Sequence, residues 1–257
     1  MHSLFQYFSY RLKAKNEHSL HSPFLFDFYT EVIKLKKQYY AFEDIENVRT
    51  DLLKSKDKIT ITDFGAGSKA INSNLRAVSA IAKHSLSSRK TSELLFRMVD
   101  YFQPTTIFEL GTCLGINTSY LASASEKSQV YTFEGCPNLA TKARSSFEKL
   151  TISPQIIIGD LGETLKKQVA EIATLDFVFF DANHQYQPTL DYFESCLPKT
   201  NENTVFVFDD IHWSEGMSRA WSEIVQHSAV RQSLDLYQVG IVFFRNSQPK
   251  QHFVLRF

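Results

Sequence analysis

Five short apolar runs between residues 104 and 209 constrain this chain more than any other feature, because each leads directly into an acidic residue. The acids are Glu109, Glu134, Asp160, Asp181 and Asp209. Helical patterns separate the runs, and this alternation is typical of a parallel sheet with helices packed on it. Since the carboxyl ends of parallel strands share one edge, the five acids are predicted to line the edge where open α/β sheets bind ligands.

The later part of the chain continues the same alternation. The expected strands are 107–109, 129–134, 155–159, 175–181 and 204–209, and the expected helices are 137–150, 162–173, 187–197 and 217–227. Residues 233–245 contain two further apolar runs that are close enough to pair as an antiparallel hairpin. The pattern therefore predicts an α/β fold from residue 101 onward.

A glycine turn follows the first of these strands. Gly111 and Gly115 bracket it, and a helix is predicted to begin shortly after Gly115. Glycine lets a backbone approach a ligand closely. The spacing is neither the Gly-x-Gly-x-x-Gly of dinucleotide binders nor the Gly-Lys-Ser/Thr of a phosphate-binding loop. The turn therefore predicts a nucleotide-type crevice without a phosphate cradle.

Residues 1–100 are predicted to form a mainly helical N-terminal extension, followed by the ligand-binding domain at 101–257. Ser22 and Pro23 read as a helix cap with a first-turn proline. Phe24, Phe26 and Phe28 are expected to pack either on the main domain or on a second subunit, so a homodimer is one assembly that the extension could serve.

Lys58 to Ser68 also reads as a strand, an acid and a glycine turn. No strand ending in an acid follows at about 20 residues, as a ribose-binding unit requires. The segment is therefore interpreted as a loop of the extension that lies over the ligand site, and Asp63–Ser68 is not expected to contact a cofactor.

The charge balance argues against several classes of partner. The chain has 28 basic and 28 acidic residues, so no general attraction to nucleic acid or to a membrane is expected. Six basic residues between Lys69 and Arg97 face only Glu93, which favours a solvated helix face. Three cysteines without metal-ligand spacing, no signal peptide and no long apolar run predict a cytoplasmic protein with free thiols.

Residues from Pro104 to Arg245 resemble the class I S-adenosylmethionine-dependent methyltransferases, and among them the small-molecule O-methyltransferases. The resemblance is carried by ELGTCLGINTSYLA, YTFEG, IIIGD with GETL, LDFVFFDA and the late strand pair. It implies a Rossmann-like, doubly wound, mostly parallel sheet of seven strands with an antiparallel last strand. It also implies an enzyme that methylates a small acceptor.

The resemblance implies a binding site for S-adenosylmethionine at the glycine turn and the following strand ends. Glu134 is the implied acceptor for the ribose hydroxyls, and Asp160 is implied to face the adenine amine. Glu109 orients either the turn or the amino-acid end of the cofactor. The implied cofactor residues are Glu109, Gly111, Thr112, Gly115, Thr118, Glu134, Gly135, Asp160 and Asp181. Carboxylates and backbone amides suit a sulfonium cofactor, which is positive at sulfur and has no phosphate.

The catalytic residues implied by the resemblance are His184 and Asp181. Asp181 and His184 stand where cation-dependent O-methyltransferases have Asp-x-x-Lys, and Asp209-Asp210 stands where they have Asp-Asn. Asp181, Asp209 and Asp210 are accordingly the implied ligands of Mg²⁺ or another divalent cation, with His184 as the base. Because histidine replaces lysine and Asp210 replaces asparagine, use of a metal stays open. The alternative is that His184 and the acids only cap the neighbouring elements.

Three functions fit these patterns. The expected one is O-methylation of a small hydroxylated acceptor. Methylation of RNA or protein is the second, supported only by the basic stretch before Arg97. The third is a non-catalytic module that binds S-adenosylmethionine. The identity of the acceptor does not follow from the sequence, since acceptor pockets are built from variable loops.

Overall fold

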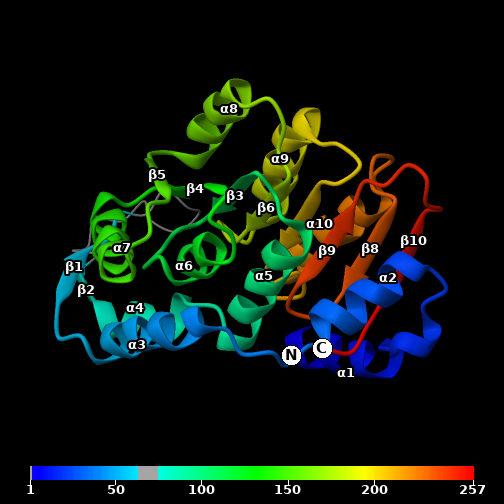
Figure 1. Cartoon of the computed structure of the whole chain (residues 1–257), viewed down its shortest axis with the longest axis horizontal. Helices are drawn as coiled ribbons and strands as arrows, with labels where there is room; N and C mark the ends of the chain where they lie inside the picture. Colours follow the sequence, from blue (N-terminus) through cyan, green and yellow to red (C-terminus); the bar gives the residue numbers. More distant parts are fainter. Residues whose placement is uncertain (1, 63–74) are drawn as a thin grey trace. The chain divides into compact units, whose positions relative to one another are not determined.

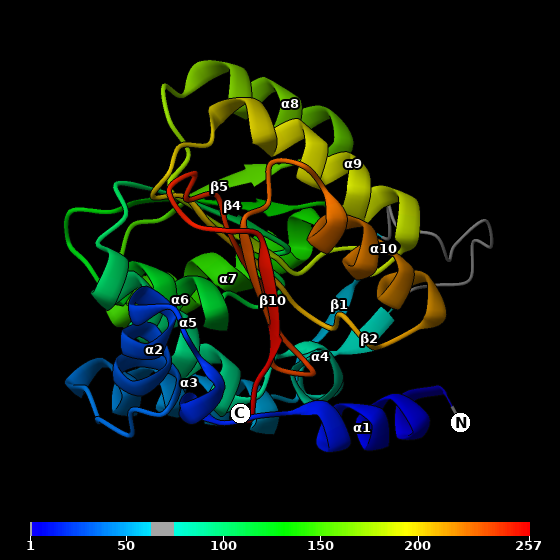
Figure 2. The ribbon, with the colours of Figure 1, turned by 90° about the vertical axis from the view of Figure 1, so that its right-hand side faces the viewer.

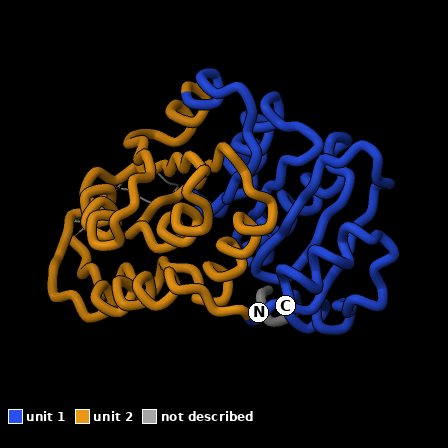
Figure 3. Tube along the Cα trace, viewed as in Figure 1, with its two compact units in different colours: residues 1–36, 168–257 blue, residues 37–167 orange. Residues whose placement is uncertain are grey.

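The computed structural model describes residues 2–62 and 75–257, with side chains from residue 6 onward. The chain divides into two compact units, Met1–Lys36 with Gln168–Phe257, and Lys37–Lys167 (Figure 3). They are called unit 1 and unit 2 here. Their boundaries differ from the predicted division at residue 100, which remains a prediction. The prediction that Asp63–Ser68 does not contact a cofactor concerns residues outside the described part of the chain.

Unit 2 consists of a three-stranded parallel segment, a small hairpin and the helices that pack on them (Figure 1). Its elements are α3 (Tyr40–Lys54), β1 (Lys58–Thr60), β2 (Leu75–Ala77), α4 (Val78–Ser85), α5 (Arg89–Phe102), β3 (Thr106–Leu110), α6 (Ile116–Ser123), β4 (Gln129–Glu134), α7 (Pro137–Leu150), β5 (Gln155–Ile158) and α8 (Leu161–Glu171), whose last turn belongs to unit 1. The strands pair in the order β3-β4-β5, and β1 pairs with β2 antiparallel.

The helices of unit 2 pack in two layers on this parallel segment. Helices α6 and α7 contact the strands, and α3 and α5 pack on α6. Phe42 and Phe96 meet edge to face with ring centroids 4.9 Å apart, and Tyr120 of α6 completes this core. Helix α6, which follows the glycine turn, is therefore held between the sheet and a second layer of helices.

Unit 1 contains the remaining strands with the first and last segments of the chain. Its elements are α1 (His2–Lys13), η1 (Glu17–Ser19), α2 (Pro23–Phe28), η2 (Tyr29–Ile33), β6 (Phe177–Phe180), α9 (Tyr186–Cys196), η3 (Leu197–Lys199), β7 (Val205–Phe208), α10 (Glu215–Gln226), β8 (Gln232–Asp235), β9 (Gly240–Phe243) and β10 (Gln251–Val254). The strands pair in the order β10-β8-β9-β7-β6, with β9 antiparallel to both neighbours. Helices α9 and α10 lie side by side (Figure 2).

The prediction of a Rossmann-like, mostly parallel sheet flanked by helices is confirmed. The strands FVFF and VFVF of β6 and β7 are buried on both faces, which is why their sequences are continuous apolar runs. The predicted antiparallel strand is β9. The predicted number of seven strands is wrong: the described residues form a sheet of eight, because β10 adds to β8 in parallel.

The N-terminal helices of unit 1 pack mainly as predicted. Ser22 caps α2 by accepting the N–H of Leu25, and Pro23 follows in the first turn. Phe24 and Phe28 contact the ring of Phe243 at centroid distances of 5.1 and 5.5 Å. The same prediction is wrong for Phe26, which is 40% exposed because it lies on the opposite side of the helix.

The first and last segments of the chain are joined by backbone pairing. Lys15 donates its N–H to the carbonyl of Val254 at 2.9 Å, and Arg256 donates to the carbonyl of Lys15 at 3.0 Å. The Tyr10 hydroxyl donates to the carbonyl of Leu255 at 2.7 Å. Helix α1 is therefore anchored to the segment that follows β10. No helix within the described residues combines the length and the apolar character needed to cross a membrane.

Candidate active site

The glycine turn after β3 uses backbone conformations that favour glycine. Gly111 and Gly115 have φ of 111° and 81°. A Cβ on Gly115 would lie 2.6 Å from the ring of Phe147, so this glycine also permits close packing of α7. The N–H groups of Gly111 and Thr112 both donate to the carbonyl of Phe133, at 3.1 and 3.0 Å. The turn is thus fixed to β4 by hydrogen bonds.

Glu109 lies beneath this turn and is completely buried. The hydroxyls of Thr118 and Thr132 both donate to Glu109 Oε2. The Thr112 hydroxyl in turn contacts that of Thr132 at 2.5 Å. Of the two roles predicted for Glu109, this geometry supports orientation of the turn. The side chains of Thr112 and Thr118 belong to the same buried network.

Glu134, at the end of β4, joins the glycine turn to the start of α7. Its Oε2 accepts the N–H of Cys113 and its Oε1 accepts the N–H of Cys136, both at 2.8 Å. Burial raises the pKa of Glu134, while hydrogen bonds from Cys136, Cys113 and Gly135 act in the opposite direction. A carboxylate has about four acceptor positions, so with three N–H groups directed at it Glu134 could still accept from a ribose hydroxyl. The predicted cofactor residues Gly111, Glu134 and Gly135 are therefore brought together.

Asp160 follows β5, the strand that pairs with β4. Its side chain is exposed, and Oδ1 accepts the N–H of Glu163 at 3.2 Å in the first turn of α8. One strand spacing, about 4.8 Å, separates β5 from β4. Asp160 thus shares the sheet edge with Glu134, as the sequence predicted.

The sequence did not predict that the hairpin β1–β2 and the residues after β1 contact the glycine turn and the start of α7. Asn138 Nδ2 donates to the carbonyl of Thr60 at 2.7 Å, and Thr62 donates its N–H to Cys136 Sγ at 3.3 Å. Ile59 and Ile61 pack in the cluster that contains Leu114. The alternation of isoleucines with polar residues at 58–62 is the only sequence signal for this contact.

A second group of acids lies in unit 1, at the ends of the parallel neighbours β6 and β7. Asp181 follows β6, and Asp209 and Asp210 follow β7. His184 Nε2 lies 3.4 Å from Asp181 Oδ1. The residues predicted to be catalytic, Asp181 and His184, are therefore in contact.

The backbone around this group is strained. Asn183, His184 and Asp210 have φ of 62°, 39° and 54°, in the left-handed region that bulky residues rarely adopt. The turn is held by the N–H of His184, which donates to the carbonyl of Ala182 at 2.8 Å, and by Asn183, which donates to the Tyr192 hydroxyl at 2.5 Å. Such strain persists where surrounding structure fixes a side chain in place, as it does in many active sites.

The charges of the acids act on His184. Burial alone would lower the pKa of His184, but the hydrogen bond and charge of Asp181, with the charges of Asp210 and Asp209, raise it from 6.5 to about 9. Burial and the carboxylates of Asp181 and Asp210 raise the pKa of Asp209 well above its ordinary value. Burial also raises the pKa of Asp210, and His184 counteracts it. Near neutral pH a protonated His184 therefore compensates the acids.

The predicted metal ligands do not fit a divalent cation in this arrangement. Within residues 2–62 and 75–257, no three His, Cys, Asp or Glu side chains converge as a metal ion would need. The geometry thus favours charge compensation by His184, and no catalytic step is assigned to a metal here.

From their place after Asp210, His212 and Trp213 are predicted to line the acceptor pocket, and Trp221 is predicted to be a core residue. Trp221 is buried, whereas Trp213 is 68% exposed. His212 lines a cleft in unit 1 that is described below. All three cysteines are free thiols.

A family model described as a methyltransferase domain matches residues 108–211, which include the glycine turn, Glu134 and the acids after β6 and β7. No curated protein sequence matches the chain.

Solved methyltransferases share the fold. The SAH-bound methyltransferase PaMTH1 of Podospora anserina superposes with a TM-score of 0.61 at 15% identity, over 88% of this chain and 98% of that chain. An O-methyltransferase from Bacillus cereus in complex with SAH gives 0.57 at 19% identity, over 84% and 96%. The O-methyltransferase TomG from Streptomyces achromogenes, in complex with SAM, gives 0.57 at 17% identity, over 86% and 96%.

The architecture is therefore that of the Rossmann-like methyltransferases. More particularly, residues 108–211 match the model of a methyltransferase domain, and the predicted methyltransferase class is confirmed.

Proposed function

We propose that this protein transfers a methyl group from S-adenosylmethionine to a hydroxyl oxygen of a small acceptor. The observation that carries the proposal is the glycine turn with Glu134 across it, because Glu134 ties the turn to α7 and keeps an acceptor position for a ribose hydroxyl. The implied cofactor residues of this turn fit a cofactor without phosphate. The bound cofactor would supply the electrophilic methyl group on its sulfonium.

His184 is the proposed base and Asp181 the residue that orients it. With Nε2 directed to Asp181 Oδ1, the neutral imidazole keeps its proton on Nε2 and leaves the lone pair of Nδ1. Nδ1 would take the proton from the acceptor hydroxyl as the oxygen attacks the methyl group. Because the pKa of His184 is raised to about 9, only a minor fraction is neutral at pH 7. The reaction is therefore expected to accelerate as the pH rises toward 9.

An acceptor panel with methyl-labelled S-adenosylmethionine tests this proposal. We expect labelled product with a hydroxylated small molecule, such as a catechol, a phenol or a sugar. Label that enters only RNA or protein would overturn the proposed acceptor class. Tight binding of S-adenosylhomocysteine without turnover on any acceptor would indicate a non-catalytic binding module.

The same assay tests the role of a metal. After exhaustive chelation we expect full turnover, because the described acids do not form a site for a divalent ion. Loss of turnover in chelator, with recovery on addition of Mg²⁺, would restore Asp181, Asp209 and Asp210 as metal ligands.

A further inference from the structure

The edge strand β10 and its neighbour β8 present polar side chains on one face of the sheet, where a core would be apolar. Ser233 and Asp235 of β8 are buried, and they alternate with Leu234, which points the other way. On β10, His252 lies beside Ser233, with Nδ1 2.8 Å from the Ser233 hydroxyl. Burying such groups costs free energy unless they are hydrogen-bonded, so this face is built for polar contact.

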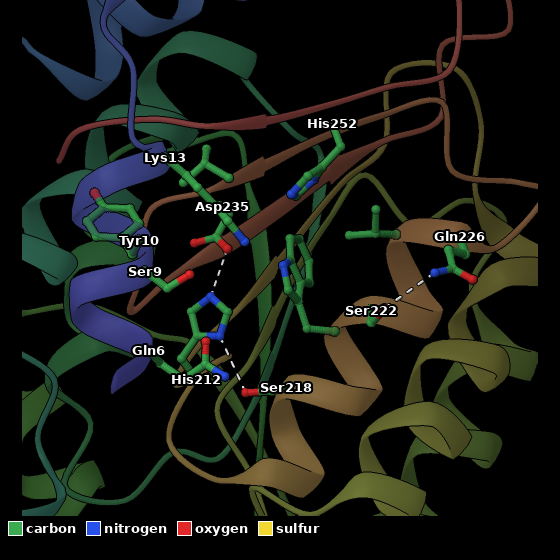
Figure 4. Close-up of a pocket in the computed structure, with 13 residues that line it drawn as sticks. Gln6, Ser9, Tyr10, Lys13, His212, Ser218, Ser222, Gln226, Asp235 and His252 are labelled. Carbon is green, nitrogen blue, oxygen red and sulfur yellow. Dashed lines mark hydrogen bonds and ion pairs between the residues drawn. The ribbon is translucent and has the colours of Figure 1, made fainter. Parts of the chain in front are cut away.

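This face forms the floor of a cleft of about 450 Å³ between α1 and α10 (Figure 4). Tyr10 and Lys13 come from α1, and Ser222 and Gln226 come from α10. A cleft of this volume is within the range of small-molecule sites.

His212 is held inside the cleft by Asp235. His212 Nε2 lies 2.7 Å from Asp235 Oδ2, and Nδ1 lies 3.4 Å from the Ser218 hydroxyl (Figure 4). Asp235 is itself fixed, because its Oδ1 accepts the N–H of Tyr237 at 2.8 Å. When the ring is neutral and its Nε2–H donates to Asp235, Nδ1 carries a lone pair and can accept a hydrogen bond in the cleft. The contact of Nδ1 with the Ser218 hydroxyl is long, at 3.4 Å, so a ligand hydroxyl could approach Nδ1 more closely.

The cleft is separate from the acid group around His184. In the strand order of unit 1, β9 and β7 lie between β8 and β6. Asp209, Asp210 and His212 all follow β7, but neither the acids of that group nor His184 lines the cleft. A ligand in the cleft therefore does not occupy the place of the acceptor beside His184.

The lining selects against a net charge on the ligand. The lining contains one carboxylate, Asp235, and one ammonium group, Lys13, which cancel in net charge, and burial lowers the pKa of His252. Lys13 lies at the exposed rim. The serine hydroxyls, the amide of Gln226 and the two imidazoles can each both donate and accept, as can the hydroxyls of a sugar ring.

We propose that this cleft is a second small-molecule site that binds a neutral, hydroxyl-rich ring of monosaccharide size, with one ligand hydroxyl donating to His212 Nδ1. The site goes beyond the proposed methyl transfer, because only His212 among its residues is a predicted acceptor-pocket residue and none takes part in the proposed transfer step. Its ligand would act either as an effector or as a remote part of a larger acceptor.

Binding is tested with the methyl glycosides of glucose, galactose and mannose as probes, by saturation-transfer NMR and titration calorimetry. We expect at least one glycoside to bind the full-length protein in the millimolar range or tighter. Its affinity should fall at least tenfold in His212→Phe. Glucuronate and glucosamine should bind more weakly than the neutral sugar.

Ser222→Trp, which fills the cleft from α10, should abolish saturation transfer, whereas Ser228→Trp, at an exposed position outside the cleft, should not. Circular dichroism checks the folding of each variant, and unchanged affinity for S-adenosylhomocysteine would show that the cofactor site is independent. Absence of binding by all three glycosides, equal binding by Ser222→Trp, or tighter binding of a charged sugar would overturn the proposal.

Discussion

The two groups of acidic residues at the strand ends are stabilised in different ways. In unit 2, Glu109 and Glu134 are held by hydroxyls and backbone N–H groups, so each carboxylate has fixed donors. In unit 1, Asp181, Asp209 and Asp210 are balanced mainly by the charge of one histidine. The first arrangement rests on hydrogen bonds, and the second depends on the protonation of His184. We infer that cofactor binding relies on fixed hydrogen bonds and that the transfer step relies on adjustable charge.

The largest expected effect is a loss of activity without a loss of cofactor binding, which distinguishes the acids of unit 1 from those of unit 2. His184→Ala should lower turnover by about 10²–10⁴-fold, the usual contribution of a positioned base, and leave the affinity for S-adenosylhomocysteine nearly unchanged. Steady-state kinetics and calorimetry on the same preparation measure the two quantities. His227→Ala is the matched control, since His227 lies beside Glu194 at 3.5 Å and has no proposed role. If the cofactor affinity of His184→Ala fell together with its turnover, the two groups of acids would act as one site.

The converse experiment removes a fixed acceptor in unit 2. Glu134→Ala should weaken binding of S-adenosylmethionine by about 1–3 kcal/mol, roughly 5- to 150-fold, because amides and hydroxyls lose their acceptor. Calorimetry gives the affinity. Glu163→Ala, at an exposed position of α8, should change it little. An unchanged affinity in Glu134→Ala would place the cofactor elsewhere.

Two glycines test whether the turn is held as tightly as its hydrogen bonds indicate. Gly115→Ala places a Cβ 2.6 Å from Phe147 at a positive φ, and should lower the free energy of unfolding by about 1–3 kcal/mol. Gly216→Ala, in α10, meets its nearest atom at 3.5 Å and should raise the free energy by a few tenths to about 1 kcal/mol through helix propensity. Chemical denaturation measures both variants. Equal changes in the free energy of unfolding of the two variants would mean that the turn rearranges to accept a Cβ at residue 115.

The last expected effect is a pH dependence confined to the acids of unit 1. The pKa of His184 is about 9 in the folded chain and near 6.5 when unfolded, so its stabilisation is full below pH 6.5 and is lost as the pH rises through 9. The raised pKa of Asp209 acts in the same direction at lower pH. Denaturation at pH 6.5 and 9.5 should show this loss in the native protein and a smaller loss in His184→Gln. Identical losses would exclude His184 as its source.

Much of the fold could be predicted because strand ends are local signals. Each buried parallel strand is a continuous apolar run, and the acid that follows it marks its carboxyl end. Strand β10 was missed because Gln251–Val254 mixes polar and apolar residues over only four positions. Phe26 was misplaced because a short helix with three phenylalanines does not indicate which ring faces solvent.

The candidate site was predictable in composition but not in geometry. The sequence indicated that Glu109, Thr112 and Thr118 belong to one turn, yet whether a carboxylate faces inward or toward a ligand depends on partners such as Thr132, 23 residues away from Glu109. Three acids at two strand ends suggested a metal. Their mutual placement depends on loop conformations at Asn183 and Asp210 that no local pattern encodes.

The anchoring of α1 beside β10 has a consequence for the order of folding. The Tyr10 hydroxyl and its acceptor, the Leu255 carbonyl, are 245 residues apart along the chain. During synthesis, Tyr10 leaves the ribosome 245 residues before its acceptor. The helix must therefore wait for a closure that is slowed by this long separation. Unit 1 can be completed only after Leu255 has been translated.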